Sequence, residues 1–426
     1  MAGALPTRPD ACGIDFGTSN STAGCGSDSE PGRAVLLNLE DGKPTIPSVV
    51  FFHAEDRHIS YGRAALADYL AGDEGRLMRS LKSLLGTSLI DEQTEVAGQA
   101  LPFRALLAQF IGELKRRAEH AAGREFTRAV LGRPVFFVDG DAAADRQAEN
   151  TLAEIARAVG LKEIAFQYEP IAAAFAYEAQ VTREELVLVV DIGGGTSDFA
   201  LVRLAPEGVR KADRREDILA SGGVHIGGTD FDKYLSLGSV MPLLGLGSQL
   251  KNGLQMPSAQ YFNLATWHTI NFAYTKQAWS QISELYREAQ EKEKLARLQK
   301  LVAERAGHWL AMQVEEAKIA LSGTPQTELN LGRIDPGEVL VLHRADFDAA
   351  IGELTDTVAR AVTGLLRDAG VLPAQVDTVF FTGGSSSVPL LRERVAALLP
   401  QARRAEGDLF GSIGSGLAID ALRKFG

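Results

Sequence analysis

The feature that most constrains the fold is a short pattern of residues that occurs twice. The copies IDFGTSNS (14–21) and VDIGGGTSDF (190–199) each end an apolar run with an aspartate and continue with glycine, threonine and serine. A further strand-like run follows each copy, so each predicts a strand, a glycine-rich turn and a second strand. Asp15 and Asp191 lie about 175 residues apart, which predicts a chain built from two duplicated halves that face each other.

Turns of this composition suit a ligand that carries phosphate groups. Glycine lets the backbone approach a ligand closely, successive N–H groups can form an anion-binding nest, and threonine and serine hydroxyls add donors. An aspartate repels phosphate, but it can hold Mg²⁺ through water, and it can orient an attacking water or accept its proton. Two such turns face to face would hold a di- or triphosphate. The alternative is a pair of ordinary hairpins in which glycine only accommodates positive φ.

Charge and missing motifs narrow the functional class further. The 426 residues carry a formal net charge of −11 without a dense basic block, which argues against binding to nucleic acid. The sequence has no P-loop, no G-x-G-x-x-G that opens a helix after the first strand, no G-x-S-x-G and no H-E-x-x-H. His53 and His58 are interpreted as surface residues in a loop.

The two cysteines, Cys12 and Cys25, are too few for a disulfide framework or a cysteine-based zinc site, and they indicate a reducing compartment. A tight hairpin centred near Thr18 would make them cross-strand neighbours; two separate reduced thiols are the simpler interpretation. The N-terminal residues lack the apolar core of a secretory signal, and no apolar run reaches the ~18 residues that span a bilayer. We therefore expect a cytoplasmic protein without membrane attachment.

Hydrophobic periodicity predicts the main secondary structure. Helices are expected at 104–122, 145–161, 281–321 and 412–424, an irregular helical segment at 62–86, and strands at 128–138, at 376–384 and near 187, 199 and 218. Pro134 lies inside the strand 128–138, where it predicts an edge, a bulge or a functional kink.

Six segments, in order, are similar to motifs of the ATPase domain of the 70-kDa heat-shock (DnaK-type) chaperone family, in the actin-like ATPase superfamily. They are GIDFGTSNS (13–21), YEPIAAAFAYE (168–178), VDIGGGTSDFALV (190–202), GGTDFD (227–232), EEAKIALS (315–322) and FTGGSSSVPLL (381–391). The resemblance covers nearly the whole chain, and it is closest to a short bacterial YegD-like branch whose members end after this domain.

The resemblance implies an α/β fold, the two-lobed actin-like ATPase fold with duplicated ribonuclease-H-like domains and four subdomains. Lobe I would cover residues 1–183, with a peripheral subdomain at about 39–103 and a C-terminal helix, 412–426, that returns to it. Lobe II would cover 184–411, with a peripheral subdomain at about 229–327.

The resemblance also implies roles for individual residues around ATP or ADP and Mg²⁺. The metal would be held, largely through water, by Asp15, Asp191 and Glu169. The catalytic residues would be Asp15, Glu169, Asp191, Thr196 and Asp198, with Asp198 near the attacking water, and Pro134 would couple nucleotide state to Glu169. The nucleotide contacts would be Gly17, Thr18, Ser19, Gly193, Gly194, Gly195, Thr196, Gly227, Gly228, Glu315, Lys318, Ile319, Ser322, Gly383, Gly384 and Ser385.

Three departures from the family pattern bear on function. Ile319 stands where the family has an arginine that stacks on adenine. Aligning YGRAAL (61–66) with the family motif places Leu66 at the catalytic lysine, with Arg63, Arg79 or Lys82 as possible substitutes. The sequence ends at AIDALRKFG without the family's acidic and apolar linker, so no peptide-binding domain is expected in cis.

Four functions remain open at this point. The first is a weak ATPase of heat-shock type, and the second is a nucleotide-dependent switch without useful turnover that acts on an unidentified protein partner, which the loss of the lysine at Leu66 would favour. The third is an actin-like filament protein, and the fourth is a small-molecule kinase on the same fold. The partner surface is expected on the segment least similar to the family, residues 238–310.

Overall fold

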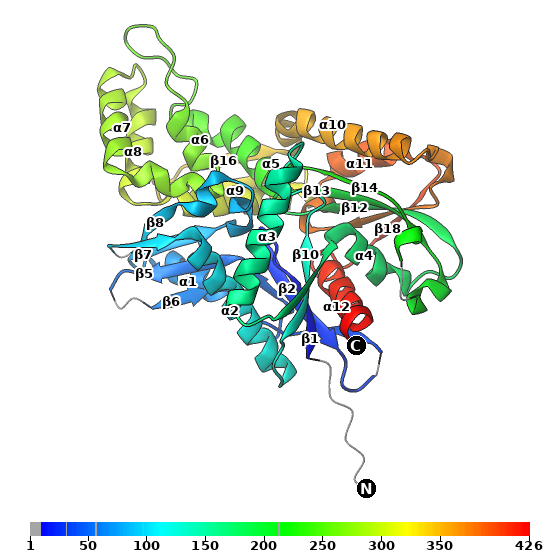
Figure 1. The fold of residues 1–426 in the computed structure, drawn as a ribbon. Coiled ribbons are helices and arrows are strands. Elements are labelled where there is room, and N and C mark those ends of the chain that lie inside the picture. Colours follow the sequence, from blue (N-terminus) through cyan, green and yellow to red (C-terminus); the bar gives the residue numbers. More distant parts are fainter. Residues whose placement is uncertain (1–9, 31, 56–57, 97, 212–213) are drawn as a thin grey trace. The chain divides into compact units, whose positions relative to one another are not determined.

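Each copy of the repeated pattern forms a hairpin in its own β-sheet. The computed structural model, which describes residues 10–426 apart from 31, 56–57, 97 and 212–213, places both sheets in one unit of the chain (Figure 1). Unit 1 comprises Met1–His225, Val358–Ser386 and Glu393–Gly426, and unit 2 comprises Ile226–Thr357 and Ser387–Arg392. Both glycine-rich turns therefore belong to unit 1.

The first sheet has the strand order β11-β10-β1-β2-β3, and β4 also pairs with β2. Its strands are β1 (Ala11–Asp15), β2 (Asn20–Gly26), β3 (Ala34–Leu36), β4 (Thr45–Pro47), β10 (Arg128–Arg133) and β11 (Glu163–Tyr168). β1 runs antiparallel to β2 and parallel to β10, and β10 runs parallel to β11. β10 ends directly before Pro134, whose nitrogen has no hydrogen to donate to a strand ladder.

The second sheet repeats this arrangement with the order β14-β13-β12-β17-β18. Its strands are β12 (Glu185–Ile192), β13 (Ser197–Leu204), β14 (Ile218–Val224), β17 (Thr378–Thr382) and β18 (Arg403–Glu406). β12 runs antiparallel to β13 and parallel to β17, and β17 runs parallel to β18, as in the first sheet. The predicted α/β class, with the duplicated ribonuclease-H-like halves of the actin-like ATPase fold, is confirmed.

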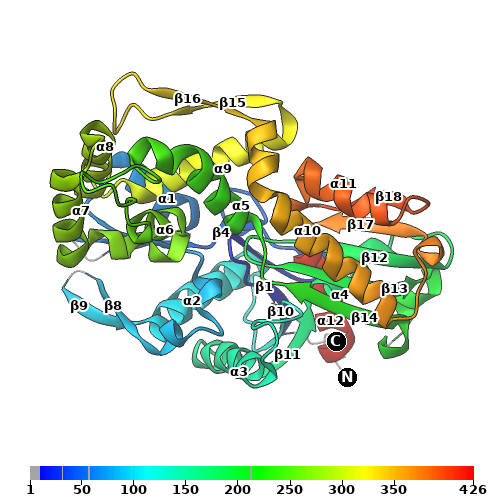
Figure 2. The same ribbon diagram turned by 90° about the horizontal axis from the view of Figure 1, so that it is seen from above.

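The helix that follows each sheet packs on the other sheet. These helices are α4 (Glu169–Glu178), which follows β11, and α12 (Ser412–Phe425), which follows β18. Ile171 of α4 shares a buried cluster with Val187 of the second sheet, whereas Leu417 of α12 shares one with Ala11 of the first. The two helices also lie side by side, as both views show (Figures 1 and 2). This exchange fixes the two sheets of unit 1 against each other.

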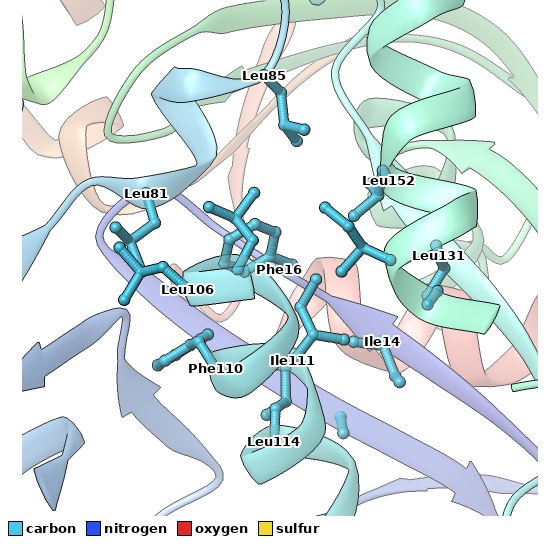
Figure 3. Packing of buried hydrophobic residues seen from close by; sticks show 14 of the residues in the cluster. Ile14, Phe16, Leu81, Leu85, Leu106, Phe110, Ile111, Leu114, Leu131 and Leu152 are labelled. Carbon is cyan, nitrogen blue, oxygen red and sulfur yellow. The ribbon is translucent and has the colours of Figure 1, made fainter. Parts of the chain in front are cut away.

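Two long helices belong to the half that contains the first sheet: α2 (Phe103–Ala122) and α3 (Ala142–Ala158). Leu106, Phe110 and Leu114 recur at steps of four on α2, and all three are buried against Phe16 and its neighbours (Figure 3). At the start of α3, the Asp141 carboxylate accepts hydrogen bonds from two backbone N–H groups of the first turn. The predicted helices 104–122 and 145–161 therefore form within a few residues of their expected bounds.

A peripheral sheet of order β6-β5-β7 and a separate β8-β9 hairpin lie between β4 and α2 in the chain. These elements are β5 (Val49–His53), β6 (Ile59–Tyr61), α1 (Gly62–Ala71), β7 (Gly75–Arg79), β8 (Gln93–Val96) and β9 (Gln99–Pro102). The prediction of one irregular helical segment at 62–86 was therefore wrong in its second part. Gly72 ends α1 in the left-handed conformation with a φ of 92°, and the next residues pair with β5 instead.

Unit 2 is mainly helical. It contains α5 (Gly228–Leu235), α6 (Ala259–Ala265), α7 (Lys276–Glu288), α8 (Lys292–Ala303), α9 (Gly307–Gly323), the hairpin β15 (Gln326–Asn330) and β16 (Val339–His343), the start of α10 (Arg344–Asp368), and the start of α11 (Pro389–Leu398). The helical segment predicted at 281–321 is divided among three helices. One interruption includes Arg305, which adopts a positive φ of 48° and ends the α8 region before α9 begins.

Three further expectations concern the chain as a whole. Cys12 pairs with Cys25 across β1 and β2, and both are buried, free thiols, so the cross-strand alternative is the one observed. Among the described residues, no helix combines the length and apolar character needed to cross a bilayer. The lobe boundaries at 1–183 and 184–411 stay a prediction.

The contact between α12 and α4 makes Gly416 a sensitive position. A Cβ on Gly416 would overlap the Ala172 carbonyl, whereas a Cβ on Gly352 of α10 would meet no atom within 4 Å. Gly416→Ala should therefore destabilise the protein by at least about 2 kcal/mol, because the two helix backbones must separate. Gly352→Ala should instead stabilise it by roughly 0.5–1 kcal/mol through lower backbone entropy in the unfolded chain. Urea unfolding midpoints of both variants test this pair; equal midpoints would contradict it.

Candidate functional site

The two glycine-rich turns meet inside unit 1. A Cβ on Gly194 would overlap Ser19 Oγ, and a Cβ on Gly195 would lie 3.0 Å from Thr18 Oγ1. Glycine is therefore needed for the close approach of the second turn to the hydroxyls of the first. The first turn is held by Ser48, whose Oγ donates to the Gly17 carbonyl at 2.7 Å. The Gly193 N–H closes the second turn by donating to the Thr196 carbonyl at 2.9 Å.

Four buried carboxylates, which we call the acid cluster, lie behind these turns: Asp15, Glu169, Asp191 and Asp198. Asp15 is the last residue of β1, and Glu169 is the first residue of α4. Asp191 and Asp198 face each other as a cross-strand pair of β12 and β13. The strand and helix ends of both halves thus bring acids from four elements to one place.

Lys82 is the cation of the acid cluster. It lies in the 3₁₀ helix Leu81–Leu84, its side chain is 8% exposed, and its Nζ donates a hydrogen bond to Glu169 Oε1. Burial alone would lower the pKa of Lys82, but the carboxylates of Glu169 and Asp15 outweigh burial and raise it. Lys82 therefore carries a positive charge against the acids.

This position corrects the interpretation of Leu66. Leu66 lies on α1, where it packs against the buried cluster that contains Val49 and Phe51 of the peripheral sheet. Arg63, another substitute considered from the sequence, forms an ion pair with Glu40 instead. Lys82, one of the three substitutes considered from the sequence, therefore reaches the acids, and the short YGRAAL alignment ended before it. The sequence did contain an indication of this role: Lys82 is a lone lysine within the largely apolar segment LKSLL, and a lysine is rarely buried unless it is paired with an acid.

Three acids of the cluster have pKa values well above their ordinary range. Burial, reinforced by the charge of Glu169, raises the pKa of Asp15 to about 7. The same two causes raise the pKa of Asp198 to about 7, and burial raises the pKa of Asp191 well above its ordinary range. One lysine cannot balance four buried acids, so the cluster favours either protons or a further cation.

Buried oxygen atoms of the cluster fit a hydrated metal ion. Asp191 Oδ1 and Asp198 Oδ2 are both buried, and neither has a hydrogen-bond partner among the residues that the structure describes. The other oxygen of Asp198, Oδ1, accepts a hydrogen bond from the Val135 N–H at 2.6 Å, which fixes the carboxylate beside Pro134. Carboxylate oxygens are the donors that Mg²⁺ prefers, directly or through water. The donor set therefore fits the predicted metal.

A cavity of about 340 Å³ opens beside Lys82. Its lining includes Thr18, Lys82, Ser83, Pro134, Gly195 and Thr196. His225 and Asp139 also line it, and His225 Nδ1 lies 2.9 Å from Asp139 Oδ1. The sequence analysis did not identify Ser83, Asp139 or His225, because none belongs to a recognisable motif.

The turn at Gly383 lies directly behind the acid cluster. Gly383 has a φ of 80°, and a Cβ on it would lie 2.5 Å from Asp191 Oδ1. A Cβ on Gly384 would lie 2.8 Å from the ring of Phe410, which is 48% exposed. Ser385 is buried. The structure thus brings this turn, which is predicted to contact the nucleotide, next to Asp191 of the acid cluster, and it places the Phe410 ring, which the sequence analysis did not identify, beside the turn.

The remaining predicted nucleotide contacts belong to unit 2. Glu315, Lys318, Ile319 and Ser322 all lie on α9, and Gly227 and Gly228 begin α5. Lys318 is buried, forms an ion pair with Asp232 at 2.7 Å and donates to the Gly228 carbonyl. Ile319 is 62% exposed. Within unit 2, α9 and the start of α5 are therefore linked through Lys318; the nucleotide contacts of these residues stay predictions.

The raised pKa of Asp198 predicts a pH-dependent stability. In the nucleotide-free protein with a chelator, the folded state keeps the Asp198 proton up to about pH 7, whereas an unfolded aspartate, with a pKa of 3.8, loses it earlier. Rising pH therefore destabilises the wild type through this window. Asp198→Asn cannot ionise and keeps the oxygen that accepts from Val135, so its stability advantage should grow by about 1 kcal/mol from pH 6 to pH 8.

Urea unfolding at both pH values measures this difference. Asp368→Asn is the matched control, because the Asp368 side chain is 70% exposed. An advantage of Asp198→Asn that is independent of pH, or that shrinks as pH rises, would contradict the prediction.

Comparison with known protein families agrees with this geometry. A family model described as "Hsp70 protein" matches residues 11–237 and 281–419. The matched residues include both glycine-rich turns, Lys82 and the whole acid cluster, and they leave out 238–280. The match extends over most of the chain and supports an ATP-binding, chaperone-like domain. The chain therefore belongs to the Hsp70 family.

Proposed function

We propose that this chain binds MgATP at the two glycine-rich turns and hydrolyses it slowly to ADP and phosphate. The observation that carries the proposal is Lys82, a buried ammonium group held among four carboxylates and exposed to the cavity between the turns. Family membership supports ATP as the ligand. The placement in a YegD-like branch stays a prediction.

Binding of the nucleotide would use groups from both turns. Backbone N–H groups and the hydroxyls of Thr18, Ser19 and Thr196 would donate to phosphate oxygens. Asp15 and Asp191 would hold Mg²⁺ through its water ligands, with Glu169 behind them. When bound, Mg²⁺ supplies positive charge that offsets the phosphates and the acids.

Two residues would carry the chemistry. Lys82 would stabilise negative charge that develops on the transferred phosphoryl group, as a fixed cation in a site that excludes bulk water. Asp198, whose pKa lies at about 7, would accept a proton from the attacking water, since a base works best with a pKa near the ambient pH. The Val135 N–H holds Asp198 in place, so movement of the Pro134 segment would change the position of this base.

The presence of Lys82 favours hydrolysis over a switch without turnover. Lys82→Met should lower the single-turnover rate of ATP hydrolysis by about 100-fold or more, because it removes one transition-state stabiliser. ATP affinity should change far less. Leu66→Lys is the matched control and should give no gain in rate, because Leu66 packs against the peripheral sheet.

Rapid-quench measurement with protein in excess over ATP provides these rates, and circular dichroism checks that both variants fold. If the wild type hydrolyses ATP no faster than Lys82→Met, the chain is a nucleotide-dependent switch. A large gain in hydrolysis rate for Leu66→Lys would instead support the sequence alignment that places Leu66 at the position of the family's catalytic lysine.

Binding of MgATP can be tested separately from hydrolysis, through its effect on thermal stability. Saturating MgATP, at about 100 times the dissociation constant, should stabilise the wild type by about 2.7 kcal/mol. Asp191→Asn should lose most of this stabilisation, since it removes a ligand charge at the metal. Thermal unfolding with MgATP, with Mg²⁺ alone and with ATP in chelator measures the effect; a wild type that does not respond to MgATP argues against nucleotide binding.

A protein partner would bind on unit 2. The family model leaves residues 238–280 unmatched, and this segment and the adjacent α7 carry the exposed aromatic side chains of Phe262, Phe272 and Trp279. Exposed aromatic rings are typical of interaction surfaces. Crosslinking in cells should recover the same partner with wild type and Leu372→Ser but not with Phe262→Ser/Phe272→Ser; retention by the double variant would reject this surface.

A further inference from the structure

One corner of the peripheral sheet gathers an imidazole and two carboxylates that the nucleotide site does not use. His53, Asp68 and Asp73 each offer a ligand atom, and these atoms all lie within 4.8 Å of one another. His53 ends β5, Asp68 lies on α1, and Asp73 follows the end of that helix. The His53 side chain is only 16% exposed, so it is not the surface loop residue expected from the sequence.

The backbone fixes these three residues relative to one another. His53 pairs with Gly75 across β5 and β7, which brings the segment just before β7 alongside it. The left-handed Gly72 turns the chain back at the end of α1, and the Asp73 N–H donates to the Asp68 carbonyl at 3.2 Å. The end of α1 and the end of the central strand β5 therefore hold the three side chains, which limits the entropy lost on binding a ligand.

The distances distinguish two roles for the carboxylates. His53 Nε2 lies 3.1 Å from Asp68 Oδ2, a hydrogen-bond distance, whereas His53 Nδ1 lies 3.7 Å from Asp73 Oδ2. Ligand atoms ~2.0–2.2 Å from a tetrahedral zinc ion are roughly 3.3–3.6 Å apart, so the second pair is spaced to share a metal. The first pair matches the carboxylate–histidine–metal arrangement, in which the carboxylate fixes the tautomer of the ligating imidazole.

Charge and neighbours also favour a metal cation. An imidazole that ligates a metal must be neutral, so the two carboxylates beside it would leave two negative charges, which a divalent cation balances. A second imidazole is close by, since the ring centroids of His53 and His58 are 5.4 Å apart, and Ser60 Oγ lies 3.4 Å from His53 Nε2. Mixed imidazole and carboxylate donors suit zinc and similar transition metals, whereas Mg²⁺ and Ca²⁺ prefer sites made of oxygen.

We propose that this corner binds one zinc ion, with His53 Nδ1 and Asp73 as ligands, Asp68 as a positioning residue and water in the open coordination positions. The ion links the end of β5 to the turn between α1 and β7. The site is separate from the acid cluster, which is built from oxygen donors and a lysine.

The experiment is a calorimetric titration of the untagged, chelator-treated chain with ZnCl₂, in excess MgCl₂ so that the oxygen-rich acid cluster is already supplied with Mg²⁺. The wild type should bind one zinc ion per chain saturably, and zinc should raise its thermal unfolding temperature. His53→Ala and Asp73→Asn should each weaken this binding at least tenfold. His343→Ala, which removes an exposed histidine of unit 2, should leave it unchanged.

A second readout reports coordination directly. Co²⁺ in place of zinc should give visible absorption bands in the wild type and in His343→Ala that disappear in His53→Ala and Asp73→Asn. Asp73→Asn preserves the shape of a half-exposed side chain, so it separates loss of a ligand from loss of folding. The proposal is overturned if the wild type shows no saturable binding, or if the two site variants bind zinc as tightly as His343→Ala; His53 would then be a histidine paired with two acids.

Discussion

The structure of unit 1 depends on a charge balance between one ammonium group and four buried carboxylates. Lys82 contacts Glu169 directly, and its charge acts on Asp15, Asp191 and Asp198 as well. Burying an unpaired acid costs several kcal/mol, so this arrangement persists only with protons or a bound cation to complete it. The same imbalance suits this site to the divalent cation that we propose it binds.

The duplicated fold explains how the acids meet. Each half places an aspartate at the end of a central strand and a glycine-rich turn directly after it. Because α4 and α12 are exchanged between the sheets, the two halves are packed with those strand ends toward each other. Gly194 and Gly195 then allow the turns to approach closely, which a side chain would prevent. The geometry of the acid cluster follows from the packing of two sheets rather than from one local motif.

Much of this was predictable from sequence, because the repeated hairpin encodes both the local structure and the duplication. Lys82 could be named only as one of three possible substitutes for the family's lysine, since its 3₁₀ helix has no periodic signature and its position depends on the pairing of β7 with β5. His53 was assigned to the surface for a similar reason: Asp68 and Asp73 reach it only because Gly72 reverses the chain. Phe410 and His225 likewise come to the site through tertiary packing alone.

Because α12 packs on the first sheet, part of that sheet stays uncovered while the rest of the chain is synthesised. The face of the first sheet around Ala11 and Val130 is covered by Leu417 and Ala421, which are translated about 250 residues after the end of β11. At roughly 5–20 residues per second, the ribosome needs on the order of 13–50 s after β11 to supply them. During that interval the nascent first half exposes apolar surface, so a member of a chaperone-like family itself presents the kind of surface that molecular chaperones recognise.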